Sequence, residues 1–270
     1  MPSINEINTL QLQVEEVAIA AGNAILSIYE RDFEIVTKTD ESPLTEADLA
    51  AHNVIIAGLE AISDLPILSE ESADIPWATR QTWNSYWLVD PLDGTKEFIK
   101  KNGEFTVNIA LISYGVPVFG VVYAPVLDTL YSGVVGKGAT KTVKGKTTAM
   151  SPASRSTAEK YQVVGSRSHQ SPEIQQFIAA LDKEAELISM GSSLKLCLVA
   201  EGAAHYYPRL GPTSEWDTGA AHAVALAAGA TVTELSLDTI ANSATHPEHQ
   251  TPLRYNQSES LLNPFFLVSF

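Results

Sequence analysis

The chain has 270 residues, of which 45% are hydrophobic and 18% are charged, as in ordinary folded proteins and unlike disordered or membrane-embedded chains. Its formal net charge of −15 argues against a nucleic-acid polymer as partner, because proteins that bind phosphate backbones usually present a basic face. No stretch reaches the ~18 apolar residues of a transmembrane helix, and the first residues lack a signal-peptide pattern. We therefore expect a cytoplasmic protein, with peripheral association at the inner membrane left open.

Two amphipathic helices are expected at the start of the chain. Apolar residues recur at helical spacing from about residue 8 to residue 30. A second helix follows Thr45 in TEADLAAHNVIIAGLEAI, with Thr45 at the N-cap position and Asp48 at the third helical position. The next segment, PILSEES, predicts a short strand that runs into the paired acids Glu70 and Glu71.

The segment WLVDPLDGTKEFI, residues 87–99, predicts a buried strand followed by a turn that carries two aspartates. Asp90 and Asp93 can face one centre if the strand ends and the chain turns, which Pro91 and Gly94 favour. Two neighbouring carboxylates need a cation. Because carboxylates are hard oxygen ligands and no Cys or His is interleaved, the cation that suits them is Mg²⁺ or Mn²⁺.

Other groups of the same segment suit such a site. The backbone carbonyl of Leu92 could supply a further oxygen ligand. GTKEFI predicts a helix start, where the free N–H groups of Gly94 and Thr95 would favour an anion such as phosphate. The alternative is structural, with Asp93 capping this helix and Asp90 ending a strand at the surface.

The pattern of elements changes in the middle of the chain. Residues 105–135 alternate apolar and polar side chains between turn signals, which predicts an antiparallel meander. After a polar stretch at 136–160, strand and helix patterns alternate, as is typical of layered α/β packing. We therefore predict an α/β protein with an α+β half at 1–155 and an α/β half at 156–270. The single cysteine, Cys197, excludes an internal disulfide and is expected in the core.

A third acidic position lies in the second half. SEWDTGAAHAV places Asp217 directly before a helix of small residues. Each acid alone is explained by a solvated turn or an N-cap, but three such ends in one chain favour a shared metal site. Asp48 and Thr95 suggest a carboxylate and hydroxyl pair that orients and deprotonates a metal-bound water. The alternative is that Asp48 serves only its own helix N-terminus.

In order and spacing, SPLTEADLAAH, PILSEES, WLVDPLDGTKEFI and SEWDTGAAHAVALAAG resemble the four signatures of the inositol monophosphatase family. These proteins are metal-dependent, lithium-sensitive phosphatases with a layered αβαβα sandwich fold. Longer strings such as DPLDGTKEFIKKNGEFTVNIALI and YPRLGPTSEWDT are similar to the bacterial 3'(2'),5'-bisphosphate nucleotidases of the family. The resemblance implies hydrolysis of adenosine 3',5'-bisphosphate to AMP and phosphate, in sulfur assimilation or nucleotide recycling.

The resemblance also implies roles for individual residues. Two or more Mg²⁺ ions per site, with Mn²⁺ as a substitute, would be held by Glu70, Asp90 and the Leu92 carbonyl in one position and by Asp90, Asp93 and Asp217 in another. Asp48 and Thr95 would activate the water, and the amides of Gly94 and Thr95 would hold phosphate oxygens. The candidates for the 5'-phosphate and adenine are Ser166, Arg167, His169, Ser192, Ser193, Lys195, Tyr206 and Arg209. Lys195 and Arg209 are preferred because a phosphate needs fixed cations.

Two alternatives keep parts of this interpretation. An inositol or sugar phosphate phosphatase of the same family would share the metals but would not need Lys195 and Arg209 to converge. A regulatory protein that holds phosphorylated ligands without hydrolysis would have no use for the pair formed by Asp48 and Thr95. The sequence does not distinguish a monomer from a dimer.

Overall fold

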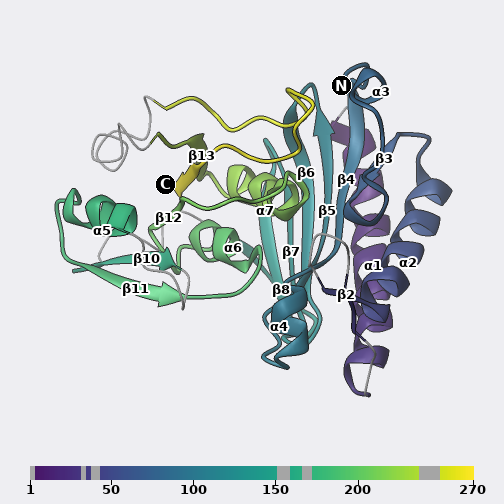
Figure 1. Cartoon of the computed structure of the whole chain (residues 1–270), viewed down its shortest axis with the longest axis horizontal. Coiled ribbons are helices and arrows are strands. Elements are labelled where there is room, and N and C mark those ends of the chain that lie inside the picture. Colours follow the sequence, from purple (N-terminus) through teal and green to yellow (C-terminus); the bar gives the residue numbers. More distant parts are fainter. Residues whose placement is uncertain (1–3, 32–34, 38–42, 151–158, 166–171, 237–249) are drawn as a thin grey trace.

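Helices and sheets alternate in layers across the molecule, as seen in a computed structural model that describes residues 4–31, 35–37, 43–150, 159–165, 172–236 and 250–270. Figure 1 shows α1 and α2 against one face of a large sheet, with α6 and α7 between that sheet and a smaller one. Helix α5 covers the outer face of the smaller sheet. This order of layers confirms the predicted αβαβα sandwich of an α/β protein.

The first part of the chain forms the large sheet and the helices that cover it. Its strands lie in the order β3-β4-β5-β6-β7-β8-β9, and all neighbours are antiparallel except β3 and β4. The elements are α1 (Ile4–Tyr29), β1 (Ile35–Thr37), β2 (Pro43–Thr45), α2 (Glu46–Ile62), β3 (Ile67–Ser69), the 3₁₀ turn η1 (Glu70–Ser72), α3 (Trp77–Arg80), β4 (Ser85–Asp93), α4 (Thr95–Ile99), β5 (Thr106–Ser113), β6 (Val116–Ala124), β7 (Thr129–Val134), β8 (Gly138–Val143) and β9 (Lys146–Met150).

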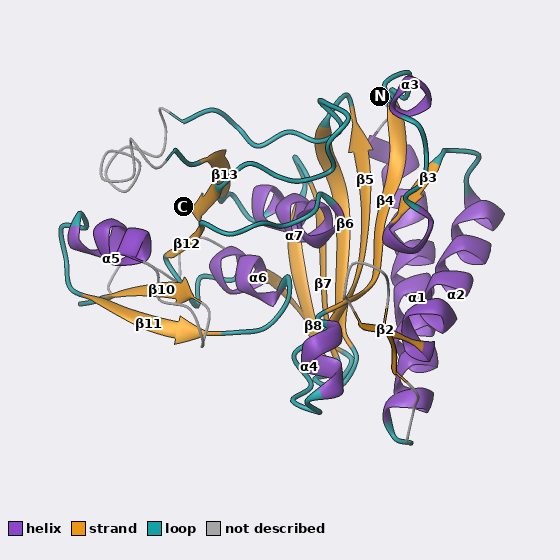
Figure 2. Cartoon of the chain, viewed as in Figure 1, coloured by secondary structure: helices purple, strands orange, loops and turns teal. Residues whose placement is uncertain are grey.

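The second part of the chain forms a smaller mixed sheet. Its strand order is β11-β10-β12-β14-β13, with β10 parallel to β11 and β12 and with β14 antiparallel to both of its neighbours. Figure 2 shows α6 and α7 packed on the inner side of this sheet. The elements are β10 (Tyr161–Gly165), α5 (Pro172–Ala179), β11 (Ala185–Ser189), α6 (Leu194–Ala200), β12 (Tyr206–Arg209), α7 (Trp216–Ala227), β13 (Thr231–Glu234) and β14 (Phe266–Ser269).

Strand β4 shows how the layers are held together. Trp87 and Val89 belong to the apolar core between the large sheet and α1 and α2. The alternate residues Tyr86 and Leu88 belong to the core that the large sheet shares with α6, α7 and the smaller sheet. Because successive side chains of a strand point to opposite faces, a strand that is apolar at every position must be covered on both faces.

The structure adds two strands that the sequence analysis did not predict. The polar stretch at 136–160 contains β8 and β9, which form a hairpin that extends the meander at its edge. Their side chains are largely exposed, so the apolar alternation that signals a half-buried strand is absent. The predicted division near residue 155 falls at 151–158, outside the described residues, and remains an interpretation. No helix among the described residues is long and apolar enough to cross a membrane.

Candidate active site

An irregularity in β4 brings Asp90 and Asp93 to one side of the sheet. Asp90 pairs with Asn108 of β5 and Asp93 pairs with Thr106, so two residues of β4 lie opposite the single residue Val107. In a regular strand, residues three apart would point to opposite faces, but one extra residue restores them to the same face. The prediction of a turn after Asp90 is therefore wrong, because a β-bulge within the strand directs both aspartates to the same face.

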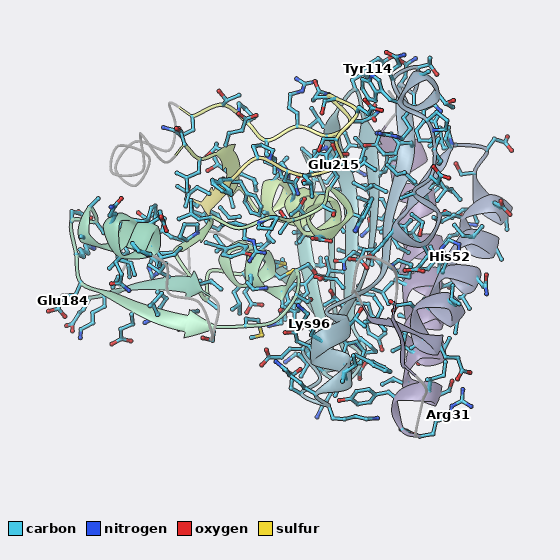
Figure 3. All side chains as sticks on the ribbon, viewed as in Figure 1. Arg31, His52, Lys96, Tyr114, Glu184 and Glu215 are labelled. Atoms are coloured by element: carbon cyan, nitrogen blue, oxygen red, sulfur yellow. The ribbon has the colours of Figure 1, made fainter. Side chains whose placement is uncertain are left out.

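The third carboxylate comes from helix α7. Ligand oxygens of Asp90, Asp93 and Asp217 all lie within 4.8 Å of one another. Asp217 is held there because its Oδ2 accepts a hydrogen bond of 2.9 Å from the backbone N–H of Ser214. Glu215, labelled in Figure 3, occupies the N-cap position of α7, so Asp217 is not the cap that one interpretation assigned to it.

Glu70 and Asp48 lie within electrostatic reach of this acidic cluster, which we define as Asp90, Asp93 and Asp217. Because β3 runs parallel to β4 with Ser69 beside Val89, the chain enters η1 at Glu70 next to Asp90. Asp48 is buried in the first turn of α2. The charges of Glu70, Asp93, Asp217 and Asp48 all raise the pKa of Asp90.

The pKa shifts of the acidic cluster arise first from burial and second from neighbouring negative charge. Burial is the largest cause of the raised pKa of Asp90, and the neighbouring carboxylates add to it. Burial and the charge of Asp93 raise the pKa of Asp217 to about 7. The pKa of Asp93 is also raised by burial, although Lys195 and the amide of Ser193 act against the shift. Carboxyl groups that repel one another in a buried position are suited to bind a cation.

The turn that we expect to bind phosphate, at Gly94 and Thr95, comes directly after Asp93 in the chain. Gly94 has a φ of 95°, a left-handed conformation that glycine adopts without strain, and it is the N-cap of the short helix α4. No side chain caps this helix. The Asp93 carboxylate accepts a hydrogen bond from the amide of Ser193 at 2.5 Å instead, which argues against a capping role for Asp93.

Ser193 has partners different from the ones we expected. Its hydroxyl donates to Oδ1 of Asn108 at 2.7 Å and lies 2.9 Å from the Thr106 hydroxyl, and its side chain is buried. Both of its donors are thus taken within the protein. The Thr106 hydroxyl also lies 2.8 Å from that of Ser192.

Asn108 and Thr106 are site residues that the sequence interpretation missed. Both are buried, and both lie on β5 opposite the two aspartates of β4. A signal was present, because Thr106 and Asn108 occur two apart, on one face, at the start of a strand that is apolar at its next four positions. Two polar side chains on the buried face of a strand require polar partners there.

Beside the acidic cluster lies a cleft of about 150 Å³ that contains the two basic side chains predicted to bind phosphate. Its lining includes Lys195 and Arg209 together with Asp93 and Asp217. The Lys195 Nζ donates to the Ser192 carbonyl at 2.8 Å, and an Arg209 Nη2 donates to the Pro212 carbonyl at 2.9 Å. The Nε of Arg209 is buried with no partner among the described residues.

Tyr206, a further predicted substrate residue, does not line the cleft. Tyr206 packs against Tyr161 and Phe177 on the α5 side of the smaller sheet, and its neighbour Tyr207 lines the cleft. Because neighbouring strand residues face opposite sides, only one of these tyrosines can reach the site. Ser166, Arg167 and His169 lie outside the described residues.

The chain is similar to known proteins over nearly its whole length. The model of the inositol monophosphatase family matches residues 7–261. Over 267 residues the chain is 50% identical to the 3'(2'),5'-bisphosphate nucleotidase CysQ of Shigella flexneri, covering 95% of this chain and 98% of that protein. It is 49% identical, with the same coverage, to the protein of that name from Escherichia coli (strain K12). The crystal structure of CysQ from Bacteroides thetaiotaomicron has a TM-score of 0.81 and 44% identity, and 97% of each chain is covered.

Proposed function

The chain belongs to the inositol monophosphatase family, and we propose that it is a 3'(2'),5'-bisphosphate nucleotidase that hydrolyses the 3'-phosphate of adenosine 3',5'-bisphosphate. It is a phosphoric monoester hydrolase, and its products are AMP and phosphate. The observation that supports this function best is that a metal-binding group of carboxylates and a phosphate-binding group of basic side chains lie side by side. An acidic cluster built from two distant segments lies directly beside a cleft that contains Lys195 and Arg209.

The residues present fit divalent metal ions. The donor set of the acidic cluster consists only of oxygen, with ligand atoms within 4.8 Å of one another, which suits hard cations. We assign Mg²⁺ to this site, with Mn²⁺ as a substitute, held by Asp90, Asp93 and Asp217 and, in a second position, by Glu70, Asp90 and the Leu92 carbonyl. When bound, the ions would lower the pKa of water and neutralise charge on phosphoryl oxygens.

The remaining roles fall to groups of the chain itself. Asp48 would accept a proton from the attacking water by way of the Thr95 hydroxyl, and the amides of Gly94 and Thr95 would donate to the oxygens of the scissile phosphate. Lys195 and Arg209 would bind the 5'-phosphate. They can do so because each already lines the cleft and neither forms an ion pair within 4 Å in the described part of the chain.

This proposal is tested by comparing two substrates. Phosphate release with Mg²⁺ is measured from adenosine 3',5'-bisphosphate and from inositol 1-phosphate. We expect a clear preference for the nucleotide in kcat/KM. An enzyme that prefers inositol 1-phosphate would instead belong to the inositol or sugar phosphate phosphatases. Absence of turnover of either, with the nucleotide bound, would indicate a regulatory binding protein.

The cationic side chains give a sharper prediction. Lys195→Ala and Arg209→Ala should each lower kcat/KM for adenosine 3',5'-bisphosphate by about tenfold or more, because each removes a charge-assisted hydrogen bond to the 5'-phosphate. The kcat/KM for adenosine 3'-phosphate, which lacks the 5'-phosphate, should fall much less. If the two substrates lose activity equally, the assignment of these residues to the 5'-phosphate is wrong. Lys183→Ala, which removes an amine outside the cleft lining, is the matched control.

A further inference from the structure

The cleft contains one carboxylate that the proposed metal positions do not use. Glu97 of α4 lines the same cleft as Lys195 and Arg209. Asp93 and Asp217 of the acidic cluster line this cleft too, and the charge of Glu97 contributes to the raised pKa of Asp93. An acid is unexpected in a cleft that binds phosphate, because the two repel each other.

Packing holds the Glu97 side chain between two glycines. A Cβ atom placed on Gly94 would lie 3.3 Å from Oε2 of Glu97, and one placed on Gly191 would lie 3.0 Å from its Cγ. The Glu97 side chain therefore occupies space that these glycines leave free, with its carboxylate beside Gly94, before α4, and its Cγ beside Gly191, before α6. Within the described residues, no group donates a hydrogen bond to the Glu97 carboxylate, which thus remains available to a ligand.

The chemistry of a carboxylate limits what that ligand group can be. An ionised carboxylate only accepts hydrogen bonds, so it binds a donor and rejects a phosphate. A nucleoside bisphosphate with an adenine base offers two neutral donors, the free sugar hydroxyl and the amino group of the base. The hydroxyl is on the carbon next to the one that carries the scissile phosphate, whereas the amino group is at the far end of the base.

Position decides between the two donors. Glu97 is adjacent to Asp93 and Gly94, the residues assigned to the metal and to the scissile phosphate. Building on the proposed function, we propose that Glu97 accepts a hydrogen bond from the sugar hydroxyl vicinal to the scissile phosphate and so makes the enzyme selective for ribonucleotides over 2'-deoxyribonucleotides. Glu97 is thereby a specificity-determining residue.

The test compares two substrates within each variant. We measure kcat/KM for adenosine 3',5'-bisphosphate and for its 2'-deoxy analogue with the native chain, Glu97→Ala and Glu97→Gln. We expect the native enzyme to prefer the ribonucleotide by about tenfold or more, the range for a hydrogen bond to a charged group. Glu97→Ala should bring the ratio close to one, and Glu97→Gln should retain part of it. A change in the active fraction cancels in this ratio, so a merely structural role would leave it unchanged.

Lys96→Ala is the matched control, because Lys96 is the exposed neighbour of Glu97 on α4 and should leave the ratio as it is (Figure 3). A ratio that stays at the native value in Glu97→Ala overturns the inference. A further comparison uses the bisphosphate with hypoxanthine in place of adenine. If Glu97→Ala changes the preference for adenine over hypoxanthine but not the preference for the ribonucleotide, Glu97 contacts the base and the inference is overturned. If the native enzyme hydrolyses neither bisphosphate, the proposed function itself fails, and that outcome is distinct from a nucleotidase without sugar selectivity.

Discussion

At the scale of single residues, the orientation of Asp93 depends on a chain of hydrogen bonds that links β4 and β5 of the large sheet to the start of α6. The Ser193 amide donates to Asp93, and the Ser193 hydroxyl donates to Asn108. Asn108 in turn donates to the Thr106 hydroxyl at 3.0 Å. Because each group has a defined partner, the carboxylate has little freedom to turn away from the acidic cluster.

Asn108 should therefore act as a positioning residue for the metal site. Asn108→Ala removes the acceptor of the Ser193 hydroxyl and leaves a buried donor without its partner, which loosens the amide that holds Asp93. We expect Mn²⁺ affinity to fall by about tenfold or more, as found when groups that orient metal ligands are removed. The measurement is Mn²⁺ binding by electron paramagnetic resonance, which needs no turnover.

A matched control for this substitution is Thr142→Ala, which removes a hydroxyl contact to Thr147 in the exposed β8–β9 hairpin. That variant should bind Mn²⁺ as the native chain does. A folded Asn108→Ala protein with native Mn²⁺ affinity would contradict the positioning role.

At the scale of elements, α7 reaches the acidic cluster because it packs very closely on the large sheet. A Cβ atom on Gly120 of β6 would lie 2.2 Å from the Ala220 carbonyl oxygen, and one on Gly133 of β7 would lie 2.7 Å from the Cα of Val224. Glycines on the strands and alanines on the helix thus set the distance between layers. Asp217, in the first turn of the same helix, is placed by this contact.

Gly120→Ala should disturb both stability and the site. The added methyl group cannot coexist with the Ala220 carbonyl, so α7 must move away from the sheet. We expect the free energy of unfolding to fall by about 1–3 kcal/mol, the usual cost of overpacking a core. Urea unfolding measures this change. Gly165→Ala in β10 is the control, since its Cβ would meet only the end of the Leu187 side chain at 3.3 Å, and it should unfold close to the native midpoint.

At the scale of the whole molecule, the distribution of charge links metal binding to pH. The chain carries a net charge of −15, and the acidic cluster gathers three carboxyl groups, of which that of Asp90 is buried and the other two are partly buried. Without a cation these groups retain protons above their ordinary pKa of 3.8, and for Asp217 the pKa is about 7. The unfolded chain releases the same protons at the ordinary value. The contribution of Asp217 to the stability of the metal-free protein is therefore complete below about pH 4 and is lost as the pH rises through about 7.

Divalent metal ions should reverse that dependence. Because a metal ion must displace the protons, its apparent affinity rises with pH up to about 7, by as much as tenfold per pH unit for each proton released. We expect the increase in Tm caused by Mg²⁺ to be larger at pH 8 than at pH 6, as measured by thermal unfolding. Asp217→Asn lacks one of the titrating groups and should show a weaker pH dependence. An increase in Tm that is equal at both pH values would contradict the linkage.

The sequence by itself determined most of what is local. Helical and alternating patterns predicted α1, α2, the meander and the later alternation of strands and helices, because periodicity records which side of an element is buried. The acids at the ends of apolar runs indicated a metal site, and the order of the motifs indicated the family. Each of these features can be recognised within a short segment of the sequence, without knowledge of which segments pack together.

Tertiary structure alone decided how those residues meet. The bulge that turns Asp90 and Asp93 to one side depends on the register between β4 and β5, and the choice of Tyr207 over Tyr206 depends on the face that β12 presents. Ser193 is directed to Asp93 and Asn108 because the start of α6 meets β4 and β5 of the large sheet. Register and facing are set by pairing between distant segments, and a shift of one residue would move each side chain to the opposite face.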